Sequence, residues 1–484
     1  MAFKHGIKFA LFPLLLAGVA SGQDAKTTIQ NAQKVMGDVK SIRYSGTGKM
    51  GGFGQNWNPN VPWHTTIITA YTRTIDYPSK SSREELTRVQ ETPPARGGET
   101  PFDGEQKIVN LVSGQYAWSQ AGIAPQPAIG AAPERQLQIW LTPHGFLLAA
   151  AENHATAKME TKDGRKITEL SFAIGKNKLR GEIDSHNAVT KVDTWIPNPV
   201  LGDMLVETTY SDYKTFVGMM FPTHIVQKEG GFATLDLSVT AAQANVENAS
   251  LEGPDVVKQA KAAPVQVESQ KLADELWWLG GGSHNSLLVE FKDYVAVVEA
   301  PNNEARSEAV IAEVKRLVPG KPIKYAINTH HHFDHSGGLR TYVAEGATII
   351  TNEGNKAFYE KAWSQPRTLE PDKLSQDPRK AAFITYKDKY ILTDGSHSIE
   401  LYRNLGDNHN EFLTLVYLPK EKLLMEPDDF NSGGPGSPPL VPMAQAFSNN
   451  LLDNVDRLKL DVVTLAPVHG PVIPMAQMRK ELGR

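Results

Sequence analysis

The segment that decides the fold of this chain is Thr329–Gly338, which reads THHHFDHSGG. It follows a compact apolar stretch, IKYAIN, which predicts a short buried strand. Side chains two positions apart in an extended segment project to the same side, so His330 and His332 can share one cation. Asp334 and His335 stand where the chain turns into a predicted helix, and there they can face a second cation close to the first. This density of imidazole and carboxylate groups at a strand end predicts a metal site.

Further candidate ligands follow later predicted strands of the same half. The stretch 399–403 leads to the sequence GDNH, which ends at His409. The stretch 423–426 leads to Asp428, and the sequence LAPVHG places His469 near the C-terminus. Four such groups at strand ends, in this order, indicate one site and not a chance clustering.

This succession of motifs resembles that of the metallo-β-lactamase superfamily over about residues 267–480. The resemblance implies a C-terminal αββα sandwich that holds two metal ions, with Asp428 between them. Asp334 is implied as both a ligand and the catalytic group that orients the nucleophile. The implied partition gives one ion His330, His332 and His409, and the other ion Asp334, His335 and His469.

Several features bear on the identity of the ligands and the metal. Pro427 stands where the family usually has Gly, and Asp429 follows Asp428; strand alternation from Glu426 favours Asp428 as the bridging carboxylate. The chain has no cysteine, so the branch of the family with a Cys ligand is excluded. The His and Asp set resembles the glyoxalase, lactonase and arylsulfatase-like branches and the β-lactamases with only His and Asp ligands. It suits Zn²⁺, two ions per chain, with Fe or Mn as alternatives.

Other histidines are weaker candidates. Strand alternation turns the side chain of His331 to the other face, which favours a core or supporting role over ligation. His284 either borders the metal cleft or lies exposed, and the sequence does not decide between the two.

The length of 484 residues and the change of pattern along the chain predict two domains. Residues 23–250 predict an antiparallel β-rich domain of unknown role, and residues 251–266 a Pro- and Ala-rich linker. From 267–484, strands alternate with helices, which predicts an α/β layered catalytic domain, so that the chain combines α+β and α/β architecture.

Local patterns in the first domain predict its elements. A helix is expected over 25–40, strands over 41–50 and 65–77, a helical stretch near 137–151, and a further strand pattern over 210–221. By pattern only, this half is similar to the half-barrel of lipoprotein carriers of the bacterial envelope.

The first 22 residues predict a secretory signal peptide. Lys4 and Lys8 precede an apolar run, and small residues follow it up to a cleavage point near Gly22. The apolar run is too short to span a bilayer, so we expect a periplasmic or secreted protein without stable membrane insertion. The net charge of −4 argues against a nucleic-acid partner and leaves a small-molecule substrate; the oligomeric state is not readable.

The resemblance implies hydrolysis of an ester, lactone or amide bond, β-lactams included, by metal-activated hydroxide. One alternative is an iron-dependent thiol or persulfide dioxygenase of the same fold. Another is a non-catalytic envelope carrier with a structural metal site, which the large ligand set disfavours because structural zinc sites close with four ligands. Substrate choice is expected to reside in the Gly- and Pro-rich segment 431–447, predicted as a loop, and in the N-terminal domain.

Overall fold

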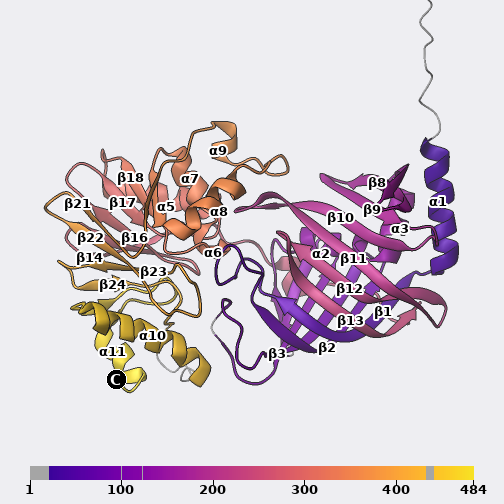
Figure 1. The fold of residues 1–484 in the computed structure, drawn as a ribbon, viewed down its shortest axis with the longest axis horizontal. Coiled ribbons are helices and arrows are strands. Elements are labelled where there is room, and N and C mark those ends of the chain that lie inside the picture. The colour runs from indigo at the N-terminus through magenta and orange to yellow at the C-terminus, as the bar shows by residue number, and fades with distance from the viewer. Residues whose placement is uncertain (1–20, 100, 123, 432–440) are drawn as a thin grey trace, which may run out of the picture.

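The computed structural model describes residues 21–99, 101–122, 124–431 and 441–484 (Figure 1). The predicted signal peptide, apart from its last two positions, and most of the predicted specificity loop lie outside these residues. Among the described residues, no helix is long and apolar enough to cross a membrane.

The N-terminal half is built on a single antiparallel sheet of 13 strands. Its order is β6-β5-β4-β3-β2-β1-β13-β12-β11-β10-β9-β8-β7, so two meanders meet where β1 pairs with β13. Figure 1 shows this sheet curved around α2. The strands are β1 Ser41–Gly51, β2 Thr65–Asp76, β3 Ser81–Gln90, β4 Gln106–Ser113, β5 Tyr116–Ala121, β6 Ala124–Pro127, β7 Thr156–Lys162, β8 Arg165–Ile174, β9 Asn177–Ile183, β10 Val189–Asn198, β11 Gly202–Phe216, β12 Met219–Glu229 and β13 Phe232–Ala244.

Helices cover one face of this sheet because alternate strand residues turn their apolar side chains toward them. The shared core joins Ile29 and Met36 from the first helix, Phe146 from the third, and strand residues such as Ile42 and Leu237. The helices of this half are α1 Ser21–Met36, α2 Ala132–Trp140, α3 Pro143–Glu152 and α4 Asp255–Gln259.

The C-terminal half contains a sheet of 7 strands and a sheet of 6 strands. In the first, β17 to β20 run parallel, and β17, VAVV, is buried at every position, as expected for a parallel strand with both faces covered. The strands are β14 Glu268–Ala273, β15 Leu276–Gly280, β16 Ser286–Glu290, β17 Val295–Val298, β18 Ile323–Ile327, β19 Thr348–Asn352, β20 Phe383–Tyr386, β21 Lys389–Thr393, β22 Ser398–Arg403, β23 Thr414–Leu418, β24 Leu423–Met425, β25 Thr464–Leu465 and β26 Ile473–Pro474.

Apolar clusters join these sheets to each other and to their helices. One cluster contains Val298 of the first sheet and Val416 of the second. Another joins the first sheet to α5 and α7, and a third joins the second sheet to α10 and α11. The helices are α5 Glu304–Leu317, α6 Phe333–Ser336, α7 Leu339–Ala344, α8 Glu353–Trp363, α9 Lys373–Gln376, α10 Pro442–Leu458 and α11 Met475–Glu481.

Some local predictions need correction. The pattern over 210–221 is not one strand, because the chain turns between β11 and β12 at Val217-Gly218. The predicted loop 431–447 is in part helix, since α10 begins at Pro442, a residue suited to the first helical turn. The predicted linker contains α4, whose Val257 is buried against Val109 and Trp118 of the N-terminal sheet.

Candidate metal centre

The Thr329–Gly338 segment follows β18 and enters the short helix α6, as its sequence predicts. Asn328 holds the backbone at the point where the chain leaves β18. Its Nδ2 donates to the carbonyl oxygen of His330 (2.6 Å). Its Oδ1 in turn accepts hydrogen bonds from the hydroxyls of Thr351 (3.0 Å) and Tyr359 (2.6 Å). The backbone that carries the histidines is therefore held from β19 and α8.

The predicted ligands come together in two groups, each with its ligand atoms within 4.8 Å of one another. All seven residues predicted from the sequence belong to these groups, and His284 joins them. The first group is His330, His332, His409 and Asp428, and the second is His284, Asp334, His335 and His469.

Asp428 lies between the two groups. Its Oδ2 is 3.0 Å from His409 Nε2 and 3.0 Å from His335 Nε2, and its Oδ1 is 2.9 Å from His469 Nε2. Asp429 points elsewhere, where its Oδ2 accepts a hydrogen bond from Asn404 Nδ2 (2.7 Å). The position between the groups is thus occupied by the carboxylate that strand alternation favours.

Acceptors outside the site fix how several imidazoles are turned. His332 donates from Nε2 to the carbonyl oxygen of Asn56 (2.9 Å), and His335 donates from Nδ1 to Glu299 Oε2 (2.8 Å). His469 donates from Nδ1 to the carbonyl oxygen of Ser283 (3.1 Å). In its neutral form, each ring therefore presents its other nitrogen, without a proton, to the site.

His331 lies outside both groups, as strand alternation predicts. Asn410 Nδ2 donates to its Nδ1 (3.1 Å), so its Nε2 donates to Asn56 Oδ1 (2.9 Å). This buried ring links the C-terminal half to the N-terminal half and has no nitrogen left for a metal.

Burial favours the neutral form of three histidines, whereas the carboxylates around His335 and His409 outweigh burial and raise the pKa values of those two rings. Burial lowers the pKa of His332 to about 3, and it lowers the pKa values of His330 and His331 well below the ordinary range. A neutral imidazole is the form that donates a lone pair to a metal.

The carboxylates keep negative charge in the middle of the site. Burial alone would raise the pKa of Asp428, but His335 and His409 hold it well below its usual range. Behind it, burial and the charge of Asp428 raise the pKa of Glu426 to about 8. The site therefore has two ionised carboxylates facing the imidazoles, Asp334 and Asp428, and a protonated acid behind Asp428.

The loop between β1 and β2, residues 52–64, reaches from the N-terminal half into this site. Gln55 Nε2 donates to Asp334 Oδ1 (2.9 Å), across 279 positions of sequence. His284 Nε2 donates to the other oxygen, Oδ2 (3.2 Å), so both oxygens of Asp334 are held. The carbonyl oxygen of Gly54 accepts from the backbone amide of Phe333 (3.3 Å), whose ring packs edge-on against Trp63.

Sequence reasoning missed the residues that reach the site from distant segments. Gln55, Asn56 and Glu299 carry no metal-binding motif, and the sequence left His284 undecided. The structure buries His284 at 5% exposure. For His284, its position just after a Gly-rich turn between two predicted strands was the available signal.

The residues present fit a metal cofactor. The atoms His332 Nδ1, His335 Nε2 and Asp428 Oδ2 are buried and accept no hydrogen bond. Leaving such groups unpaired costs about 1–3 kcal/mol each, which a cation would offset. Imidazole nitrogen and carboxylate oxygen are also the donor set of zinc sites.

Comparisons with known proteins agree with the predicted resemblance. The family model of the metallo-beta-lactamase superfamily matches residues 279–410, which confirms the resemblance of the C-terminal half. A search of curated proteins found no match.

Solved structures with similarity include the DIM-1 metallo-beta-lactamase, at 18% identity over 45% of this chain and 96% of that chain, with a TM-score of 0.35. A metallo-beta-lactamase from Pontibacter korlensis is 17% identical over 45% of this chain and 98% of its own, also with a TM-score of 0.35.

Proposed function

We propose that this protein is an exported, metal-dependent hydrolase that cleaves an ester, lactone or amide bond of a small molecule, β-lactams included. The observation that carries the proposal is the pair of ligand groups joined at Asp428, which lies within 3.0 Å of histidines from both. A closed structural zinc site would need only four ligands, and here the donors exceed that number.

We further propose two Zn²⁺ ions, one held by His330, His332 and His409, the other by Asp334, His335 and His469, with Asp428 shared. Bound divalent ions would supply Lewis acidity and make a water molecule acidic enough to ionise near neutral pH. The layered sheets and helices around them support an αββα sandwich as the fold that carries the site.

The side chains of the chain itself would position the reactants. Asp334 is oriented by Gln55 and His284, one on each carboxylate oxygen. It is therefore positioned to orient a water molecule, as its proposed catalytic role requires. Partial exposure of the Asp334 side chain, at 34%, leaves it accessible from the solvent side, whereas His330 and His335 are fully buried.

Metal analysis and a substrate panel test this proposal. We expect about two divalent ions per chain in protein purified without chelator, and hydrolysis of some member of a panel of chromogenic esters, lactones and a cephalosporin. Activity should be lost with chelator and regained with Zn²⁺. Oxygen uptake without hydrolysis would favour the iron dioxygenase instead, and folded protein that never binds metal would contradict the whole proposal.

The variant His332→Ala should lose metal and activity together, because it removes a donor that Asn56 holds in place. His186→Ala is the matched control, since His186 is exposed in a turn of the N-terminal half. Mass spectrometry of protein from the culture medium or the periplasm tests export, which the basic, apolar and small residues of 1–22 support.

A further inference from the structure

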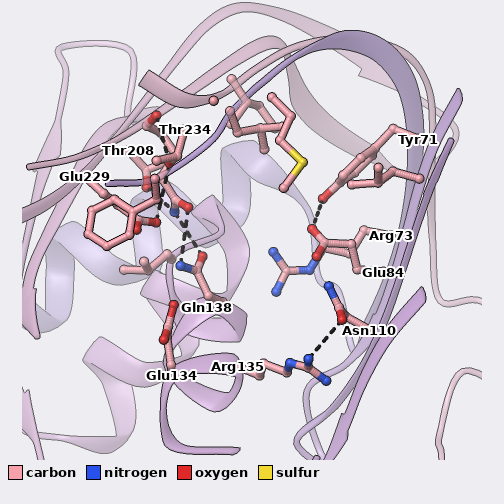
Figure 2. A pocket seen from close by; sticks show the side chains of 18 of the residues that line it. Tyr71, Arg73, Glu84, Asn110, Glu134, Arg135, Gln138, Thr208, Glu229 and Thr234 are labelled. Atoms are coloured by element: carbon pink, nitrogen blue, oxygen red, sulfur yellow. Dashed lines mark hydrogen bonds between the residues drawn. The ribbon is translucent and has the colours of Figure 1, made fainter. Parts of the chain in front are cut away.

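A cavity of about 580 Å³ lies between the curved N-terminal sheet and α2 (Figure 2). Its walls come from β1 to β4, α2 and β11 to β13, all in the N-terminal half, and its volume is that of pockets that hold small molecules. Apolar side chains such as Leu86 and Ile225 share these walls with charged ones.

The same cavity reaches the metal centre. Phe333 and Asp334 belong to its lining together with Gly52, Phe53 and Gln55 of the β1–β2 loop. One end of the cavity is thus formed by the proposed catalytic carboxylate. A molecule whose reactive bond lies at Asp334 would extend its remaining part into the N-terminal half.

The guanidinium groups that line the cavity differ in their hydrogen-bond and ion-pair partners within the protein. Arg88 pairs with Glu99 at 3.7 Å and also binds Gln106. The terminal nitrogens of Arg135 donate hydrogen bonds to the carbonyl oxygens of Leu111 and Trp118 and to the side chains of Asn110 and Ser119. Both groups are therefore held by the protein itself.

Arg73 of β2 is different. It is 9% exposed, donates from Nε to Ser82 Oγ (3.2 Å) and has the hydroxyl of Tyr44 as a further neighbour, but it takes part in no ion pair among the described residues. Burial lowers its pKa, but Tyr44, Tyr71 and Glu84 outweigh burial and raise it, so the group is charged. Figure 2 shows its terminal nitrogens directed into the cavity.

A buried guanidinium with no ion pair in direct contact is costly, and a ligand that supplies a contacting negative charge would offset that cost. Glu84 faces Arg73 across β2 and β3 and supplies negative charge nearby, but it lies outside ion-pair distance, and its Oε1 accepts a hydrogen bond from Tyr71 (2.7 Å). In Figure 2, Glu134 and Glu229 lie on the other side of the cavity from Arg73, beside Gln138. Burial, and then Glu134, raise the pKa of Glu229 to about 7, so this wall holds less negative charge at neutral pH than its composition suggests.

We propose that this cavity is the binding site for the non-reacting part of the substrate, which carries a carboxylate at the far end that pairs with Arg73. The inference rests on the proposed hydrolase function for the reactive end of that molecule. The substrate class is then an elongated, partly apolar ester, lactone or amide with a distal carboxylate, which spans from Asp334 to β2.

The first test uses hydrolysis. Mono-4-nitrophenyl esters of succinic, adipic, suberic and sebacic acid are compared with neutral 4-nitrophenyl esters of matched length, on metal-loaded enzyme. One length of diacid ester should exceed its neutral partner at least about tenfold in kcat/KM, mostly through KM, because a buried charge pair forms. Arg73→Met should abolish this preference and Arg73→Lys should keep part of it. Arg43→Met, at an exposed arginine of β1 outside the cavity, should leave it unchanged.

The second test needs no catalysis. Isothermal titration with sodium octanoate and with octanamide should give binding at least about tenfold tighter for the carboxylate, and Arg73→Met should remove the difference. Octanoate that binds equally well to Arg73→Met sits at the metal ligands, and this result overturns the inference.

The two tests separate the possible failures. Hydrolysis of neutral and diacid esters at equal rates, with no octanoate binding, overturns the cavity proposal while the hydrolase stands. Octanoate binding that depends on Arg73, without hydrolysis of any ester, lactone or cephalosporin of the panel, overturns the hydrolase while the carboxylate site stands. A preference for amino-terminated esters would assign recognition to Glu134 and Glu229 and also refutes the proposal. If Arg73→Met does not fold, Arg73→Lys decides, because it should weaken the preference for octanoate over octanamide, and an unchanged preference overturns the inference.

Discussion

The contact between Gln55 and Asp334 gives the sharpest test of how the N-terminal half supports the metal centre. Gln55→Ala removes the hydrogen bond from Nε2 to Asp334 Oδ1 (2.9 Å) and leaves the one from His284 in place. A hydrogen bond to a charged group contributes about 1.5–3 kcal/mol. If this contact orients Asp334 in the transition state, kcat/KM should fall about tenfold to about a hundredfold, since 1.36 kcal/mol corresponds to a factor of about ten.

The assay is steady-state hydrolysis of the best substrate of the panel, with metal content measured on the same samples. Gln115→Ala is the matched control, because Gln115 is an exposed glutamine whose amide contacts only its neighbour Tyr116. Full metal content with a kcat/KM within about twofold of the wild type would refute the positioning role of Gln55. Loss of metal in Gln55→Ala would instead make the residue a support of the site as a whole.

Other substitutions probe the centre, the loop and the cavity. Glu299→Gln should weaken metal binding about tenfold to a hundredfold in a chelator competition, because it replaces the carboxylate that orients His335. Gly54→Ala should lower the free energy of unfolding by more than about 1 kcal/mol and reduce activity, since φ is +77° and the new Cβ would lie 2.7 Å from the ring of Phe333. The pKa of Glu229, raised to about 7, predicts that this residue's contribution to the free energy of unfolding is most favourable below about pH 4.5 and falls by up to about 3 kcal/mol as the pH rises to about 7. Glu229→Gln should remove that fall in urea unfolding curves.

Each substitution has a matched control in the chain. Glu275, like Glu299, has a positive φ, but its carboxylate pairs with Lys420 on the surface, so Glu275→Gln should keep metal affinity. Gly104 has φ +73° with no atom near its Cβ position, so Gly104→Ala measures backbone strain without the collision. Glu247→Gln changes an exposed glutamate and should leave the pH dependence intact. Equal effects in a variant and its control would contradict the corresponding prediction.

The clustering of the candidate metal ligands could be predicted because their signal is local. His330 and His332 are two apart after an apolar strand, and His409, Asp428 and His469 each follow a strand end. Strand alternation also separated His331 from its neighbours, since one position changes the face of a strand.

The supporting residues could not be predicted, because tertiary packing alone brings them to the site. Gln55 and Asn56 lie in a polar loop more than half the chain away from the histidines, and no spacing rule connects them. The strand β3, SSREELTRVQ, was missed for a related reason. Its charged residues line a cavity and the protein surface. The strand therefore lacks the alternation of apolar and polar residues that is typical of a strand with one face packed in a hydrophobic core.

The docking of the β1–β2 loop also bears on how this protein is made and how it could be shortened. Because synthesis runs from the N-terminus, strands β1 to β13 leave the ribosome before the histidine segment does. The β1–β2 loop can therefore already be in place when that segment folds. A fragment starting near residue 267 would expose the backbone amide of Phe333 and the rings of His331 and His332, which Gly54 and Asn56 cover in the whole chain. We therefore expect the histidine-bearing half to need the N-terminal half for an ordered site, so that a shortened protein should keep the β1–β2 loop and the sheet that carries it.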